Sequence, residues 1–337
     1  MRSRFLPLSF ASLLLFQTGV SGLFAASERA SMIVVIGAAG DSEFGSNFVH
    51  QASLWDQACA KAGLRQVTIG LSSPGQTNDC ELLQHALEAE PKEGTAQLWL
   101  VLIGHGTFDG KEAKFNLRGP DVSDVELAAW LKPFHRPLAI INTSSSSAPF
   151  INRLSATNRV VITATRSGHE ENYAHFGSYL ADAMTNPQAD LDKDGQVSLL
   201  EAFLIASRQA TEFYKLNGRL ATEHALLDDN GDGLGTPADW FRGLRATKKP
   251  KDAAMVDGLL AQQFHVLESE AEGKLTPEQR AKRDALEHSI FAYRERKTRL
   301  TEDEYYDGLE KMLLELARLY VLNAPEATNS SPEKPRP

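Results

Sequence analysis

Short apolar runs alternate with longer polar segments over the first half of the chain. The runs occupy residues 31–37, 65–71, 98–103, 136–142 and 159–165, and each leads into a glycine or a polar turn. Runs of this length are typical of strands that are covered on both faces, as in a parallel sheet. The segments between them predict helices at about 47–61, 79–90, 124–131 and 148–154. Strands and helices in this alternation predict an α/β fold with a mostly parallel central sheet.

The last quarter of the chain has a different pattern. A basic linker at 245–252 precedes a charged region in which Thr276–Gln279 and Thr301–Glu304 are capping boxes followed by apolar stripes. We therefore expect an all-helical module over 253–323. Such stripes form an intramolecular core, or they mediate self-association or docking to a protein partner. Residues 324–337 are rich in Pro, Ser and Glu, a composition typical of disorder.

Charge and the first residues indicate where the protein works. The 337 residues carry a formal net charge of -9, which argues against nucleic acid and anionic membranes as main partners. A basic start followed by the apolar segment 5–16 resembles a secretory signal, so we expect a signal peptide at 1–26, export to the periplasm or medium, and no membrane contact after cleavage. In an oxidising compartment Cys59 and Cys80 could pair, but two buried thiols fit the sequence equally well.

Polar residues follow two successive strands. His105 stands in Gly104-His105-Gly106 after the run at 98–103, and Thr143–Ser147 follows the run at 136–142. Because it follows a buried strand directly, the serine run is expected to be a strand-to-helix turn rather than a linker. The carboxyl ends of parallel strands meet at one edge of a sheet, where α/β proteins place their chemistry. By itself His105 could cap its strand or act in catalysis, and the neighbouring turn favours an active-site edge.

The order strand, His-Gly, strand, small-residue turn, strand resembles the caspase and legumain group of cysteine peptidases, over roughly residues 31–227. Val35-Ile-Gly37 and His50-Gln51-Ala52 are also similar to the start of legumain. The resemblance implies a caspase/legumain-like sandwich over 27–244, plus the C-terminal helical module, with a peptide or protein ligand at the sheet edge.

The same resemblance places the nucleophile where this chain has Ser144. In the family a cysteine stands there, and both cysteines of this chain lie before His105. The basic residue with which the legumain branch binds the substrate side chain is not evident either, since Val49 falls near its place. This departure indicates a protein that is impaired as a cysteine peptidase and acts as a binding or scaffold module.

The alternative is an active peptidase or esterase that uses Ser144 as the nucleophile. A serine needs an aligned base and an oxyanion hole, because its hydroxyl does not ionise near neutral pH. His105 would be the base, and the backbone N–H groups of Gly106 and Ser144 would form the hole. Asp109 is the candidate for a third member because it is close in sequence.

The acidic loop 190–201 matches the calcium loop of an EF-hand, between helices expected at 175–184 and 198–216. Its predicted ligands are Asp190, Asp192, Asp194, Gln196 through its carbonyl, Ser198 directly or through water, and Glu201 in bidentate fashion. We therefore expect bound Ca²⁺, as a structural rather than a signalling ion. A weaker second site at Asp228, Asn230, Asp232 and Asp239 competes with a plain Asp/Asn/Gly turn.

Overall fold

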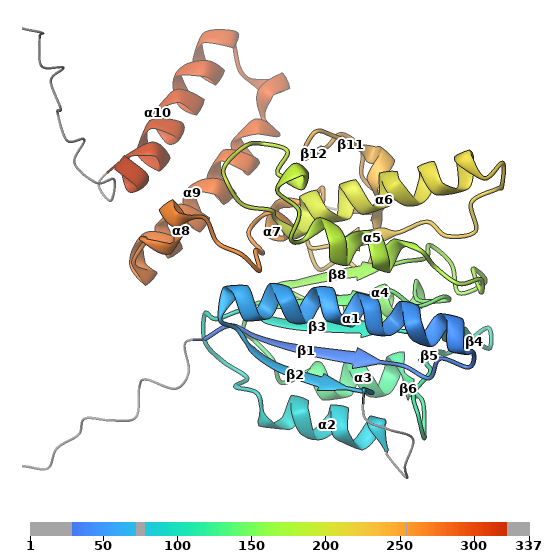
Figure 1. Cartoon of the computed structure of the whole chain (residues 1–337). Coiled ribbons are helices and arrows are strands. Elements are labelled where there is room, and N and C mark those ends of the chain that lie inside the picture. Colours follow the sequence, from blue (N-terminus) through green and yellow to red (C-terminus); the bar gives the residue numbers. More distant parts are fainter. Residues whose placement is uncertain (1–28, 72–77, 254, 322–337) are drawn as a thin grey trace, which may run out of the picture.

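The computed structural model describes residues 29–71, 78–253 and 255–321. At its centre is a seven-stranded sheet in the order β10-β9-β8-β7-β3-β1-β2, in which the five strands from β8 to β2 are parallel (Figure 1). The strands are β1 (Ser31–Ile36), β2 (Arg65–Ile69), β3 (Leu98–Ile103), β7 (Leu138–Asn142), β8 (Arg159–Thr163), β9 (Leu226–Asp228) and β10 (Thr236–Pro237).

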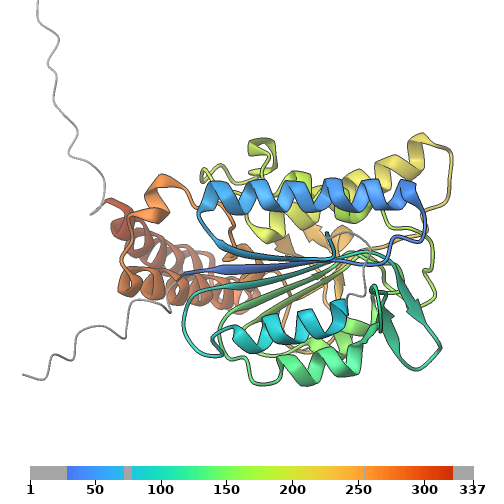
Figure 2. The same ribbon diagram turned by 60° about the horizontal axis from the view of Figure 1, so that its bottom comes forward.

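Helices cover both faces of this sheet (Figure 2). β1, β3, β7 and β8 are buried at every position, which is why their sequences are continuous apolar runs. One face packs against α1 (Ser42–Ala62), α5 (Phe176–Ala183) and α6 (Leu199–Leu216), and the other against α2 (Asp79–Ala89), α3 (Asp124–Leu131) and α4 (Pro149–Leu154). The predicted α/β class with a mostly parallel sheet is confirmed.

Helix α1 begins five residues before the predicted start at residue 47. The side chain of Asp41 accepts the N–H of Glu43 and caps the helix there, so the glycine-containing loop after β1 is shorter than expected. The start of α3 agrees with the prediction because Ser123 and Glu126 form a capping box. Local caps therefore decided where these helices begin.

Short strands were not predicted. After β3 the chain forms a small antiparallel sheet of β4 (Gly106–Phe108), β5 (Ala113–Phe115) and β6 (Val122–Ser123). β9 and β10 add an antiparallel edge to the main sheet, and β11 (Phe241–Arg242) pairs with β12 (Arg245–Ala246). Strands of two or three residues are too short to show a periodic pattern.

The C-terminal region is helical, as predicted, and its first part packs on the main sheet. Ala261, Phe264 and Val266 belong to the core on one face of the main sheet, so the predicted linker at 245–252 does not separate two cores. Beyond them, two long helices form a hairpin at one end of the molecule (Figure 1). The helices of this region are α7 (Leu259–Gln262), α8 (Glu270–Gly273), α9 (Pro277–Arg294) and α10 (Glu302–Val321), with single 3₁₀ turns at Pro187–Ala189, Ala238–Trp240 and Lys297–Arg299.

Cys59 and Cys80 are both free thiols. They lie on α1 and α2 and pack on opposite faces of the sheet, so the interpretation as two separate thiols holds. The predicted signal peptide at 1–26 and the tail at 324–337 lie outside the described residues. Among the described helices, none is both long and apolar enough to cross a membrane.

Candidate functional site

His105 and Ser144 follow the ends of neighbouring parallel strands, as predicted. β3 and β7 pair in a register that places Leu102 beside Asn142. The His105 ring lies among aromatic rings, with ring centroids 4.8 Å from Phe44 and 6.2 Å from Tyr173. Burial lowers the pKa of His105, and a hydrogen bond with the backbone of Ala39 only partly offsets this. A neutral imidazole at this position has the protonation state of a general base.

The Ser144 hydroxyl is not directed at a base, as a catalytic nucleophile would be. Ser144 is fully buried, and its Oγ donates to the Oδ1 of Asn142 at 2.6 Å. Its backbone N–H donates to the same Asn142 oxygen at 3.1 Å. Both donors of Ser144 are therefore committed to one side chain two residues earlier, and neither is left for a base or an oxyanion.

The second predicted donor of the oxyanion hole is also occupied. The Gly106 N–H donates to the Oγ of Ser145 at 3.2 Å, and that hydroxyl donates back to the Gly106 carbonyl at 3.1 Å. Asp109, the candidate third member, has an exposed carboxylate whose Oδ1 accepts the N–H groups of Lys111 and Glu112, both at 2.9 Å, and closes its own turn. The predicted residues are neighbours, but their hydrogen bonds are those of a structural turn.

The serine run is a buried turn between β7 and α4, which confirms the prediction against a flexible linker. Residues 143–147 are 5% exposed or less. Ser147 contacts the Thr165 hydroxyl at 3.2 Å, and Ser146 has a φ of 54°, in the left-handed region. The turn is thus held by side-chain hydrogen bonds to neighbouring strands and loops.

A polar cluster next to this turn was missed. The Ser146 N–H donates to the carbonyl of Glu170 at 2.9 Å, and the Glu170 carboxylate lies 2.6 Å from His224 Nδ1 and 3.5 Å from Arg166 Nε. The buried Glu223 carboxylate accepts the N–H of His175, the N-cap of α5, and the N–H of Phe176, its first residue, both at 2.8 Å. Burial raises the pKa of Glu223. Glu170 and His224 are 54 residues apart in the sequence, so no local motif could have connected them.

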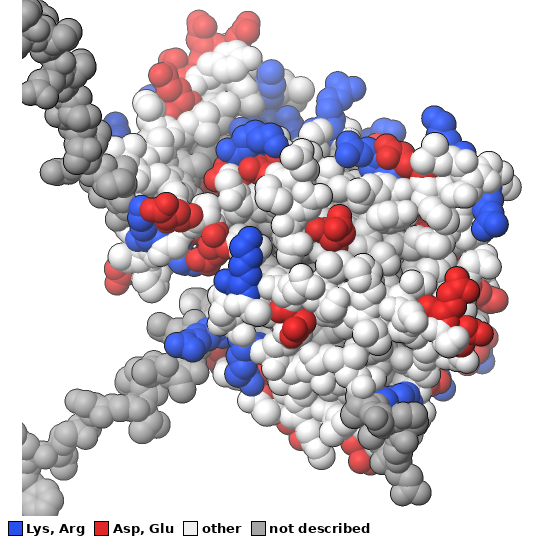
Figure 3. All heavy atoms as spheres, in the orientation of Figure 1, with Lys and Arg blue, Asp and Glu red and all other residues white. Residues whose placement is uncertain are grey.

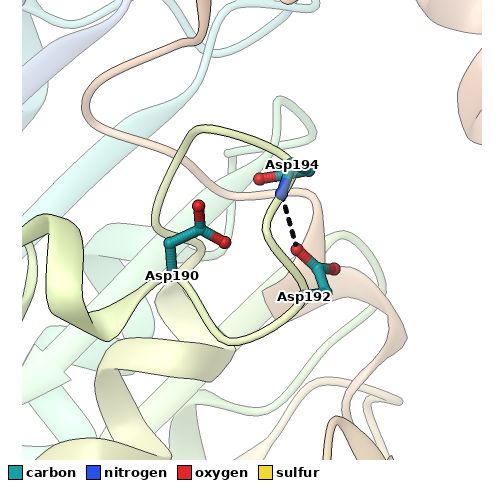
Figure 4. Close-up of side chains that lie close together, drawn as sticks. All are labelled: Asp190, Asp192 and Asp194. Atoms are coloured by element: carbon teal, nitrogen blue, oxygen red, sulfur yellow. Dashed lines mark hydrogen bonds between the residues drawn. The ribbon is translucent and has the colours of Figure 1, made fainter.

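The acidic loop 190–201 brings three of its predicted ligands together (Figure 4). Ligand oxygens of Asp190, Asp192 and Asp194 all lie within 4.8 Å of one another, and no other group of three potential metal-binding side chains was found among the described residues. Partial burial, with the charges of Asp194, Glu201 and Asp190, raises the pKa of Asp192 to about 6. Gly195, with φ 91°, makes the sharp turn at the sixth position. The three carboxylates therefore fit a hard divalent cation.

The other three predicted ligands hold the loop in shape. The Glu201 carboxylate is outside the aspartate cluster: its oxygens accept the N–H of Leu191 at 2.7 Å and of Ser198 at 2.8 Å. Ser198 caps α6. The Oε1 of Gln196 accepts the Ser269 N–H at 3.0 Å, which ties the loop to the C-terminal region. Bidentate coordination by Glu201 would require it to exchange these backbone donors for the ion.

The second acidic loop has the hydrogen bonds of a turn. Asp228 accepts the Ser155 hydroxyl at 2.6 Å and the Gly231 N–H at 3.1 Å, and Asn230 Oδ1 accepts the Asp232 N–H at 2.9 Å. Asp239, the predicted closing ligand, lies in the separate 3₁₀ turn Ala238–Trp240. Of the two interpretations, this arrangement favours the Asp/Asn/Gly turn.

Comparisons with family models and with curated proteins found no match. Among solved structures, the chain is similar to the initiator caspase Dronc of Drosophila (15% identity, TM-score 0.40, 67% of this chain and 93% of that chain). It is also similar to a protein from Geobacter sulfurreducens (12%, 0.37, 54% and 89%) and to caspase-1 from Spodoptera frugiperda (8%, 0.38, 60% and 87%). The similarity concerns the arrangement of the sheet and helices and says nothing about activity.

Proposed function

We propose that this protein is an exported, calcium-stabilised binding or scaffold module that keeps a caspase/legumain-type sheet edge without its hydrolytic chemistry. The observation that carries the proposal is the 2.6 Å hydrogen bond from the buried Ser144 hydroxyl to Asn142. A nucleophile needs its proton directed at the base and its oxygen open to substrate.

Restoring a serine mechanism would require several coupled changes. Ser144 would have to leave Asn142, and the Gly106 N–H would have to leave Ser145. Loss of a single oxyanion-hole donor typically costs a factor of about 10² to 10³ in turnover. Because both predicted donors are engaged, the resting arrangement favours an inactive edge.

The surface next to the edge supports binding of an apolar group. Phe44 and Tyr173 are half-buried, with ring centroids 5.0 Å apart, and their centroids lie 4.8 Å and 6.2 Å from that of His105. Aromatic rings with one open face bind apolar side chains at little entropic cost. We therefore propose a peptide or protein ligand at this edge.

Bound calcium would stabilise the folded state. An ion bound at the three aspartates would offset the electrostatic repulsion between their carboxylates. The loop then holds residues 263–269, since Gln196 accepts the Ser269 N–H and the Leu199 N–H donates to the Phe264 carbonyl at 2.8 Å. The ion is therefore expected to stabilise the contact between the sheet and the C-terminal region, by mass action on the folded state.

A fluorophosphonate probe tests the absence of a serine nucleophile. The purified chain and its Ser144→Ala variant are expected to remain equally unlabelled, while a known serine hydrolase in the same tube is labelled. Ser144→Cys is expected to gain no peptidase activity, because its side chain still faces Asn142. Labelling that disappears in Ser144→Ala would refute the proposal.

Titration calorimetry with calcium tests the metal site. We expect one ion per chain with a dissociation constant on the order of 0.1–1 mM, typical of extracellular modules. Asp192→Asn should abolish the binding heat, whereas the matched control Asp239→Asn in the second loop should leave it unchanged. Identical melting temperatures in calcium and in chelator, together with no binding heat, would contradict this part of the proposal.

A further inference from the structure

A cavity lies at the end of the central sheet opposite to His105. It measures about 360 Å³ and lies between the C-terminal ends of α1 and α2 and the starts of β1, β2 and β7. The parallel strands begin at this end, whereas the edge with the proposed peptide or protein ligand lies where they stop. Cavities that hold small molecules measure about 300–1,000 Å³, so this one has room for a small ligand.

Three arginines and a single carboxylate line this cavity. The carboxylate is that of Glu90, which is 3% exposed and forms ion pairs with both Arg65 and Arg136, the latter at 3.3 Å. Arg29 is exposed and pairs with no carboxylate in the part of the chain that the structure describes. Figure 3 shows basic side chains at this end of the molecule, beside the start of the described chain. One negative charge thus faces three positive charges, and the cavity favours an anion.

Arg136 is the buried arginine of the set. It lines the cavity although it is only 2% exposed. Its Nε donates to the Ala96 carbonyl at 2.7 Å, its Nη2 to the Gln97 carbonyl at 3.0 Å and its Nη1 to Glu90. A guanidinium group carries five N–H groups, so two of them have no acceptor among the described residues. Because a buried charge is costly unless it is paired and fully hydrogen-bonded, and Arg136 shares its only carboxylate with Arg65, an anion in the cavity would supply the missing acceptors.

The lining favours a phosphate group over a carboxylate. Guanidinium groups bind the oxygens of both anions through pairs of parallel hydrogen bonds. A carboxylate offers two oxygens and a single charge, whereas a phosphate ester offers three acceptor oxygens and nearly two charges, so only the phosphate can engage three arginines at once. Leu64 and Pro91 add an apolar part to the lining, which suits a small organic group attached to the phosphate.

We propose that this cavity binds the phosphate group of a small molecule. Arg29, Arg65 and Arg136 donate to the phosphate oxygens, and Glu90 holds two of these arginines in place. The bound ligand joins the starts of three strands to the ends of two helices, and it stabilises the folded chain by mass action. The proposal depends neither on the calcium loop nor on Ser144, so its failure would leave the proposed function untouched.

Titration calorimetry of the full chain with inorganic phosphate, in chelator and at constant ionic strength, tests the site. We expect saturable binding of phosphate at one site and binding of acetate at least tenfold weaker. Arg29→Gln should weaken phosphate binding at least tenfold, the loss typical of a hydrogen bond to a charged group, and should leave the urea midpoint unchanged because Arg29 has no ion pair to lose. Arg242→Gln is the matched control, since Arg242 is exposed on β11 outside the cavity, and it should bind phosphate like the wild type. No binding heat with phosphate, or an equal loss in both variants, would overturn the proposal.

A soluble phosphate compound and a lipid headgroup share this chemistry, and vesicles distinguish them. We expect the chain to stay in the supernatant when vesicles of phosphatidylglycerol or of phosphatidylcholine are sedimented. The reasons are that Arg136 and Glu90 are buried and that the net charge of -9 opposes contact with an anionic membrane. Sedimentation with the phosphatidylglycerol vesicles that Arg29→Gln abolishes would refute a small soluble ligand.

Discussion

His265 makes the stability of this protein depend on pH. It lies at the junction between the acidic loop and the C-terminal region, where it forms an isolated antiparallel bridge with Ser198. Burial and the nearby charge of Arg283 lower its pKa from 6.5 to about 3. The folded protein therefore keeps this imidazole neutral under conditions in which the unfolded chain would protonate it.

The expected change in the free energy of unfolding follows from the difference between the pKa of His265 in the unfolded and in the folded chain. Between pH 6.5 and 3 the unfolded chain binds one more proton at this site, so the stabilisation is complete above pH 6.5 and is lost as the pH falls. The loss approaches about 1.4 kcal/mol for each pH unit. From pH 7 to pH 5, His265 alone should lower the free energy of unfolding by about 2 kcal/mol.

Urea unfolding of the wild type and of His265→Gln, measured at several pH values, isolates this contribution. Other groups act in the opposite direction, since burial and the charge of Asp229 raise the pKa of Asp257 to about 8. Only the difference between the two proteins is therefore informative. That difference should shift by about 2 kcal/mol in favour of the variant between pH 7 and pH 5. His288→Gln, an exposed position on α9, is the control and should follow the wild type. Parallel curves for His265→Gln and wild type would refute the reasoning.

Three further outcomes can be checked on the same protein. Gly106→Ala should destabilise by about 1–3 kcal/mol in urea unfolding, because its Cβ would lie 2.4 Å from a backbone oxygen, while Gly273→Ala, which meets no atom within 4 Å, should be neutral or stabilising. Arg136→Ala should cost about 1–3 kcal/mol, since it removes hydrogen bonds to the buried Glu90 carboxylate and to the carbonyls of Ala96 and Gln97, while Arg65 still pairs with Glu90. Native protein should react with a thiol reagent at Cys80 before Cys59, because burial raises the pKa of Cys59 to about 12, and two thiols should be counted after unfolding.

The sequence by itself determined the elements whose cause is local. The buried strands have continuous apolar runs as their sequence. The capping boxes Thr276–Gln279 and Thr301–Glu304 mark the starts of α9 and α10, and a spacing of aspartates and a glycine marks the loop at 190–201. The order of the strands also placed His105 and Ser144 at one sheet edge, because successive βαβ units have few possible arrangements.

Tertiary structure decided what these residues do. Gly106 and Ser145 form hydrogen bonds with each other although they are 39 residues apart, and Glu170 and His224 do so at a separation of 54 residues. No local sequence pattern could therefore predict either pair. The commitment of Ser144 to Asn142 is short in sequence, yet it depends on the burial of the whole turn under neighbouring loops. Whether a hydroxyl donates to a base or to an amide is decided by the atoms that packing places around it. This is why the motif order predicted an active-site edge, whereas the structure shows Ser144 and Gly106 held in the hydrogen bonds of a turn.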